Sequence, residues 1–286
     1  MLKFTIDKQK CTKCGFCAND CPAGIIVMNT VYPAIATEQE TACFKCQHCL
    51  AVCPTGAISI LGKNPENSKP LKGNLPDPDQ LETLIKGRRS VRQYRDENLA
   101  PELIQRLLDV AWHAPTGHNA RRVMFTVIDD KEVMAKFRDE TMQGLIRVVR
   151  ENRLPAGMWI VAELVSLWEE QRVDAVFRGA PHLIVASAPK VGATPESDCL
   201  IALSYFELFA QSLGVGTVWD GIAKLTFNDL VPGLRKTLGI PDGHLIGYAM
   251  AFGKPAVNYH RTVEQDKTSI AYVISQNEQM ISRVNR

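Results

Sequence analysis

The first 62 residues contain two copies of one cysteine spacing, which constrains the fold more than any other feature of the sequence. Each copy has the form Cys-x2-Cys-x2-Cys-x3-Cys-Pro, and together the copies use eight of the nine cysteines. They consist of Cys11, Cys14, Cys17, Cys21 and Pro22, and of Cys43, Cys46, Cys49, Cys53 and Pro54. Three thiolates spaced by two residues can bind one iron–sulfur cube, and a fourth thiolate from another part of the chain completes the ligand set. The spacing therefore predicts two [4Fe-4S] clusters.

In two-cluster proteins of this kind, the last cysteine of each copy ligates the other cluster. We expect one cluster on Cys11, Cys14, Cys17 and Cys53, and a second on Cys43, Cys46, Cys49 and Cys21. A disulfide framework is disfavoured because the N-terminus is short and charged, without an apolar export segment. Zinc is the main remaining alternative, although zinc sites usually use cysteine pairs or mixtures of cysteine and histidine.

This segment resembles a bacterial two-cluster ferredoxin over about its first sixty residues. The sequence Cys-Pro-Ala-Gly-Ile-Ile at 21–26 is echoed by Cys-Pro-Thr-Gly-Ala-Ile at 53–58. The two similar halves suggest a pseudo-twofold arrangement around the clusters.

The bulk composition is that of an ordinary globular protein with room for a second domain. The chain has 286 residues, of which 45% are hydrophobic and 22% charged, and its formal net charge is +2. No dense basic stripe indicates a nucleic-acid partner, and no apolar run is long enough for a membrane span. Reduced cysteines and the absence of a targeting signal favour a cytoplasmic location.

The distribution of proline and of apolar residues predicts three segments: a ferredoxin module at 1–62, a linker at 63–79 and a larger domain at 80–286. In the larger domain, helices are expected at 81–86, 101–112 and 198–213, with inserted helical material at 130–179. Strands are expected at 123–128, 183–188, 215–219 and 245–251. The order of these elements predicts an α+β fold, or a three-layer α/β domain with a modest central sheet.

A group of basic residues follows the linker. Arg88, Arg89, Ser90 and Arg92 fall within five residues, and guanidinium groups with a hydroxyl can bind a phosphate dianion. The alternative is a solvated basic turn. No Gly-x-Gly-x-x-Gly after a strand and no Walker A sequence is present, so a Rossmann or P-loop site is unsupported.

The larger domain resembles the nitroreductase family of FMN-dependent reductases. Four segments carry the resemblance, and they are residues 88–92, Ala114-Pro-Thr-Gly-His-Asn119, Gly214-Val-Gly-Thr-Val-Trp-Asp-Gly221 and 247–255. The resemblance implies a mixed sheet flanked by helices, as in an α/β sandwich, and a homodimer with FMN at the subunit interface. Fusion to a ferredoxin module is itself known in this family.

Several residues match cofactor-binding positions of that family. Arg88, Arg89, Ser90 and Arg92 match positions that contact the FMN phosphate and ribityl chain, and Asn119 matches an asparagine near the isoalloxazine edge. The backbone around Trp219, Asp220 and Gly221 matches the loop that passes flavin N5, and Arg261 is the counterpart of a C-terminal phosphate-binding cation. The sequence departs from the family after Asn119, where Ala120-Arg121-Arg122 replaces a common Gln-Pro pair.

Three further residues invite a chemical role without establishing one. His113 and His118 flank the Ala-Pro-Thr-Gly turn and could donate a proton, but a turn histidine is more often structural. Cys199 lies on an apolar helix, which favours burial as a small hydrophobic residue over catalysis.

These features predict an oxidoreductase that takes electrons from an external low-potential donor. The electrons pass through two [4Fe-4S] clusters to FMN, and from FMN to a small acceptor such as a nitroaromatic, quinone or activated alkene. The alternative is an electron-transfer or redox-sensing protein whose acceptor is another protein. An open pocket beside the 130–179 insertion would favour the enzyme.

Overall fold

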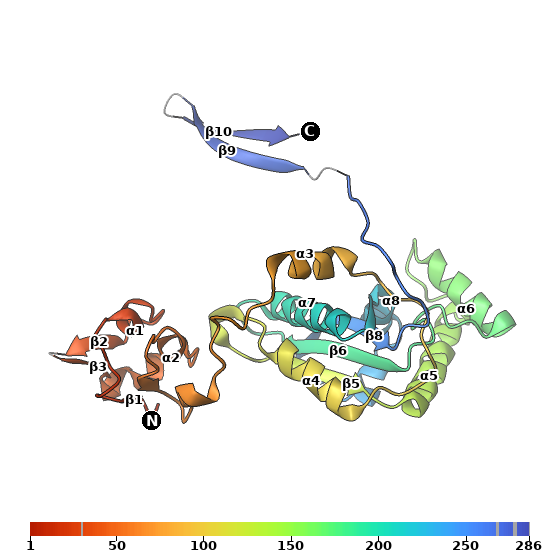
Figure 1. The fold of residues 1–286 in the computed structure, drawn as a ribbon. Helices are drawn as coiled ribbons and strands as arrows, with labels where there is room; N and C mark the ends of the chain where they lie inside the picture. Colours follow the sequence, from red (N-terminus) through yellow and green to blue (C-terminus); the bar gives the residue numbers. More distant parts are fainter. Residues whose placement is uncertain (30, 267–268, 277–278, 286) are drawn as a thin grey trace.

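The computed structural model describes residues 1–29, 31–266, 269–276 and 279–285, and Figure 1 shows their arrangement. The N-terminal module (residues 1–62) lies beside one end of a larger second domain (residues 80–253). Beyond that domain an extended segment leads to a hairpin of β9 (Ile270–Gln276) and β10 (Gln279–Asn285), which stands apart from both (Figure 1). None of the described helices is long and apolar enough to cross a membrane.

The N-terminal module is built from two similar halves around a small apolar core. Its elements are β1 (Thr5–Ile6), α1 (Phe16–Asn19), β2 (Ile26–Asn29), β3 (Tyr32–Ile35), the 3-10 helix η1 (Thr37–Ala42), α2 (His48–Ala51) and β4 (Ile58–Ser59). Strand β1 pairs with β4 and β2 with β3, both antiparallel. Helices α1 and α2 occupy equivalent places in the two halves, and each carries the third cysteine of its copy, Cys17 or Cys49. The internal symmetry expected from the sequence is therefore present.

The predicted linker at 63–79 is partly structured. It contains the 3-10 helix η2 (Pro65–Asn67), which packs back on the module because Glu66 forms an ion pair with Lys10 at 2.7 Å. Helix α3 (Pro78–Gly87) begins earlier than the expected 81–86. The reason is a cap that the periodicity did not reveal, in which the Asp77 carboxylate accepts from two amides of the first turn and Pro78 takes the first helical position.

A four-stranded sheet forms the centre of the second domain. Its strands are β5 (Met124–Ile128), β6 (His182–Pro189), β7 (Gly216–Trp219) and β8 (His244–Gly253), in the spatial order β5-β6-β8-β7. All three pairings are antiparallel. The strand positions agree with the sequence prediction, and the mixed character that the resemblance implies comes from a parallel contact at β7. Strand β8 lies between β6 and β7 and runs antiparallel to both. The parallel contact is an isolated bridge between Ser90 and Thr217.

Helices cover both faces of the sheet, as Figure 1 shows. The helices of the domain, besides α3, are α4 (Pro101–Trp112), η3 (Gly117–Asn119), α5 (Lys131–Arg150), α6 (Trp159–Gln171), α7 (Pro195–Ser212), α8 (Gly221–Leu225), the π-helix η4 (Thr226–Leu230) and α9 (Leu234–Thr237). Alternate residues of β6 point to opposite faces of the sheet. Leu183 and Val185 pack toward α5 and α6, whereas Ile184 and Ala186 pack toward α4 and α7. The expected insertion at 130–179 is thus α5 and α6, and the α+β class is confirmed.

Candidate functional site

The eight cysteines of the two copies line two cavities in the N-terminal module. The first cavity is lined by Cys11, Cys14, Cys17 and Cys53, and the second by Cys21, Cys43, Cys46 and Cys49. Each cavity thus gathers three cysteines from one copy and the last cysteine of the other. This grouping is the one that the spacing led us to expect.

The surroundings of these cysteines suit an iron–sulfur cluster. Backbone amides donate to sulfur, from Ala57 to Cys53 at 3.2 Å and from Lys45 to Cys43 at 3.3 Å, and such bonds tune iron-bound thiolates. Burial raises the pKa of Cys49 to about 11, so the positive charge of iron is needed to keep this sulfur as a thiolate. The donors, the apolar walls and the four sulfurs of each cavity therefore fit a cluster.

The basic segment at 88–92 is fixed against β7. The Val91 amide donates to the Thr217 carbonyl at 2.8 Å, and Ser90 forms the parallel bridge to the same residue. The close approach requires glycine at 216, because a Cβ there would lie 2.7 Å from the Val91 side chain. The segment is consequently held in one place along the strand.

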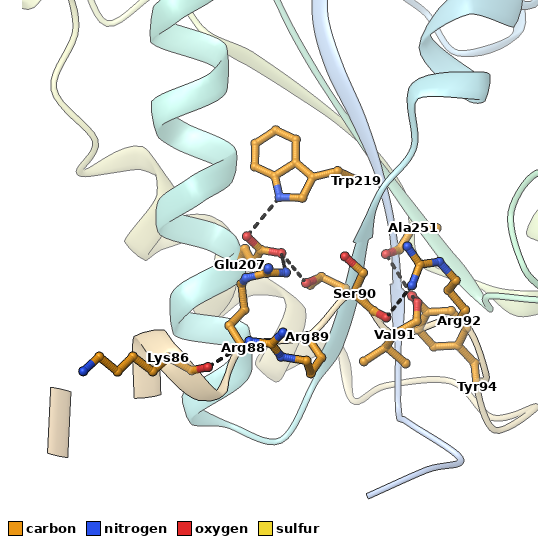
Figure 2. Close-up of polar contacts among 11 residues, drawn as sticks. Lys86, Arg88, Arg89, Ser90, Val91, Arg92, Tyr94, Glu207, Trp219 and Ala251 are labelled. Atoms are coloured by element: carbon orange, nitrogen blue, oxygen red, sulfur yellow. Dashed lines mark hydrogen bonds and ion pairs between the residues drawn. The ribbon is translucent and has the colours of Figure 1, made fainter. Parts of the chain in front are cut away.

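A buried carboxylate of α7 joins this segment to two residues of β7 (Figure 2). Glu207 accepts from Arg88 Nη1 at 3.2 Å, from Thr217 Oγ1 at 3.2 Å and from Trp219 Nε1 at 2.9 Å. Its side chain is only 8% exposed, so its charge depends on these three donors. Glu207 therefore positions Arg88 and Trp219 relative to one another.

Arg89 retains a buried donor. Its Nη2 donates to the Lys86 carbonyl at 2.9 Å, but its Nε is buried without a hydrogen-bond partner among the described residues. A buried N–H left without an acceptor is costly, and an anion placed beside it would relieve that cost. This orphaned donor fits the phosphate of FMN.

Arg92 lines a separate cleft of about 500 Å³ beside the α5–α6 insertion. The cleft is lined by Arg92, Arg138, Trp168, Arg172, Val173, Asp174, Arg178 and Gly179. Arg138 is paired with Asp174 at 2.7 Å, which leaves an excess of positive charge in the cleft. The arrangement favours an anionic or electron-rich small molecule.

The loop after β7 brings a buried carboxyl group beside this cleft. The Asp220 amide donates to the Ala249 carbonyl at 2.9 Å, and its Oδ1 caps α8 by accepting from the Ala223 amide at 2.8 Å. Its Oδ2 is buried without a partner among the described residues. Burial raises the pKa of Asp220 to about 7, and the nearby Asp174 carboxylate acts in the same direction.

Asp220 should therefore make stability depend on pH. Its folded-state pKa is above the unfolded value of 3.8, so the folded protein binds the extra proton between about pH 4 and 7 and loses stability as the pH rises through that window. We expect Asp220→Asn to remove this loss, which is at most about 1.4 kcal/mol per pH unit. The measurement is the melting temperature of both proteins at pH 4, 5.5 and 7. A constant difference between variant and wild type across the window would contradict the assignment.

The turn that contains Asn119 faces the N-terminal module. Asn119 Nδ2 donates to the Phe44 carbonyl at 2.8 Å, and the His118 and Phe44 rings meet edge to face with centroids 6.0 Å apart. The structure thus gives the Asn119 amide a partner in the module, which the sequence did not suggest. His118 contacts an aromatic ring, and no carboxylate partner for it is found among the described residues.

The remaining candidates lie away from this arrangement. Arg261 is exposed on the extended segment beyond β8, and His113 is exposed at the end of α4. Cys199 is fully buried beneath Gly247, where a Cβ would lie 2.2 Å from that of the cysteine. Burial also raises the pKa of Cys199 to about 12. Its predicted role as a small hydrophobic residue is confirmed.

Sequence reasoning missed Glu207 and Phe44, and of the arginines in the cleft it found Arg92 alone. A signal for Glu207 was available, because it is a lone acidic residue in the otherwise apolar middle of α7. Phe44 gave no signal, since a phenylalanine between two cysteines is also suited to packing within the module.

Comparison with known proteins agrees with both halves of the chain. Residues 10–64 match a family model described as "4Fe-4S dicluster domain", which confirms the iron–sulfur prediction over zinc. Residues 85–254 match the model described as "Nitroreductase family". A putative NADH dehydrogenase/NAD(P)H nitroreductase of Methanothermobacter thermautotrophicus is 30% identical over 193 residues, which are 66% of this chain and 83% of the relative.

Two solved structures have the same fold in the second domain. A nitroreductase with bound FMN from Desulfitobacterium hafniense is 26% identical with a TM-score of 0.53, over 68% of this chain and all of that one. One from Bacteroides fragilis, also with bound FMN, is 21% identical with a TM-score of 0.55, over 67% of this chain and 98% of that one. With its sheet, its fixed basic segment and its matched sequence model, the chain belongs to the nitroreductase family and carries a 4Fe-4S dicluster domain ahead of the family domain.

Proposed function

We propose that this protein is an FMN-dependent oxidoreductase that takes electrons from an external low-potential donor through its two clusters and passes them to a small acceptor. When bound, the clusters carry single electrons and FMN converts them to two-electron chemistry at N5. The single observation that carries the proposal is the contact between the module that holds eight cysteines in two cavities and the turn at 118–119 of the family domain.

The protein's part is to bind and orient these groups. Cys11, Cys14, Cys17 and Cys53 would hold one cluster, and Cys21, Cys43, Cys46 and Cys49 the other. Arg88, Arg89 and Ser90 would bind the FMN phosphate, with Glu207 fixing the direction of Arg88.

Other family positions complete the proposed flavin site. Arg92 would reach the ribityl chain, and Arg261 would add a cation to the phosphate, as the resemblance implies. Gly221 occupies the first position of α8, where a backbone N–H has no acceptor within its helix and can point to flavin N5. Asn119 is the remaining carried-over position, and its amide nitrogen is engaged by Phe44.

The cleft beside the α5–α6 insertion supports an enzyme over an electron carrier for a partner protein. Its volume of about 500 Å³ is that of a small-molecule site, and it lies next to Asp220. Its arginines favour acceptors that carry negative charge or polar groups such as nitro or carbonyl oxygens. We further propose a homodimer, which would cover apolar side chains such as Tyr272 and Val273, both exposed on the β9–β10 hairpin.

The proposal is tested on anaerobically purified protein by iron and FMN assays followed by steady-state turnover with nitroaromatic and quinone acceptors. We expect about eight irons and one FMN per chain, and faster turnover with reduced ferredoxin than with NADH or NADPH. Protein without FMN, or turnover with NAD(P)H that is indifferent to the presence of clusters, would refute the proposed electron route.

A further inference from the structure

The N-terminal module meets the second domain at an aromatic side chain of the second cysteine copy. Phe44 follows Cys43 directly and lines the cavity shared by Cys21, Cys43, Cys46 and Cys49. The same residue touches the other domain twice, through its carbonyl with Asn119 and through its ring with His118. Phe44 thus connects the wall of one cluster cavity to a turn of the family domain.

The equivalent position in the first copy has a different residue. Aligning the two copies on their cysteines places Thr12 where the second copy has Phe44, and Thr12 lines the cavity of Cys11, Cys14, Cys17 and Cys53. Thr12 makes no hydrogen bond or aromatic contact with the second domain in the part of the chain that the structure describes. The symmetry of the module is therefore broken at the residue that makes the interdomain contact.

The turn that receives Phe44 is held rigidly in an uncommon conformation. His118, Asn119 and Arg121 all have φ near +52°, which costs energy for residues other than glycine. Asp198 of α7 accepts from the Gly117 amide at 3.0 Å, and a Cβ at 117 would lie 2.3 Å from Thr194 Oγ1. Strain of this kind persists only where the surroundings enforce it, and it is frequent at functional positions.

We infer that Phe44 docks the module on the His118–Asn119 turn, so that the cluster of the second cavity is the one that faces the flavin. The cluster of the first cavity then faces the external donor. This inference rests on the proposed function and adds the direction of electron flow through the module. Per hydride equivalent delivered to the acceptor, two electrons leave the external one-electron donor, cross the Phe44 contact one at a time and are joined by one proton from solvent.

The test uses the full-length protein loaded with clusters and FMN. Phe44→Thr gives the second copy the residue that the first copy already has, so cluster assembly should survive, as an iron assay can verify. The matched control is Thr12→Ala, and His118→Ala probes the contact from the other side without touching the module. Hydrogen exchange of residues 117–121 reports docking, because the amides of Gly117, Asn119, Ala120 and Arg121 are hydrogen-bonded within the domain.

We expect exchange in this turn to be roughly three- to tenfold faster in Phe44→Thr and His118→Ala, the factor set by loss of one aromatic pair, and unchanged in Thr12→Ala. Stopped-flow reduction of the flavin by reduced ferredoxin should slow several-fold in the same two variants. Exchange rates that stay at the wild-type value with eight irons retained would overturn the docking contact. Unchanged flavin reduction in Phe44→Thr and His118→Ala, with exchange in the turn accelerated, would overturn the assignment of the second cavity as the one that faces the flavin. Failure of the wild type to reduce FMN at all would refute the proposed function and leave the exchange result standing.

Discussion

Cys49→Ala is expected to abolish ferredoxin-driven turnover while FMN stays bound. Cys49 is 6% exposed at the centre of α2 and lines the second cavity, so its loss removes one of four sulfurs from a site that faces the family domain. The iron content should fall from about eight to about four atoms per chain, because a four-iron cube with only three thiolates is labile. The measurements are iron and FMN contents and the rate of acceptor reduction with reduced ferredoxin.

The matched control is Cys199→Ala, which removes a buried cysteine that lies outside both cavities. This variant should retain its iron and its turnover. If Cys49→Ala turned over at the wild-type rate with the same donor, electrons would reach the flavin without the second cluster and the proposed route would be wrong.

Glu207→Ala is expected to lower the free energy of unfolding by about 3–5 kcal/mol, the usual cost of breaking a buried ion pair. The substitution leaves the Thr217 hydroxyl and the Trp219 indole N–H without their acceptor and frees Arg88 from its position. For a domain of this size the melting temperature should fall by roughly 10 °C. Glu207→Gln keeps an oxygen acceptor and should lose less.

Glu196 provides the control on the same helix. It pairs with Lys224 at 2.9 Å but is 59% exposed, so Glu196→Ala should change stability by no more than about 1 kcal/mol. Thermal unfolding of the three variants, together with FMN titration, separates the structural role of Glu207 from its effect on Arg88. Equal stability losses in Glu207→Ala and Glu196→Ala would show that the network contributes little.

The features that the sequence predicted well are those set by local spacing. The three cysteines spaced by two residues in each copy line one cavity, and the apolar periodicity of 101–112 predicts α4. The buried strands were also found near their observed places, because β6 and β8 are apolar runs bounded by turns. In the candidate site, residues 88–92 were singled out by their clustered basic side chains and then matched by family resemblance, whereas 219–221 were proposed from the resemblance alone.

The features that were missed depend on distant parts of the chain. Glu207 meets Arg88 across 119 residues, and Asn119 meets Phe44 across 75, so neither pair leaves a local pattern. The direction of the strands likewise depends on β8 entering between β6 and β7, which the order of elements along the chain does not specify. These contacts and strand directions depend on which distant segments meet in the fold, and residue type alone does not reveal that.

The partly structured linker at 63–79 has a consequence for the contact at Phe44. One hydrogen bond and one aromatic pair would not hold two separate proteins together at cellular concentrations. A covalent tether of this length maintains an effective concentration in the millimolar range, at which a weak contact is sufficient. The tether thus supplies what the two contacts alone lack, and dilution of the protein should not separate the module from the turn at which it docks.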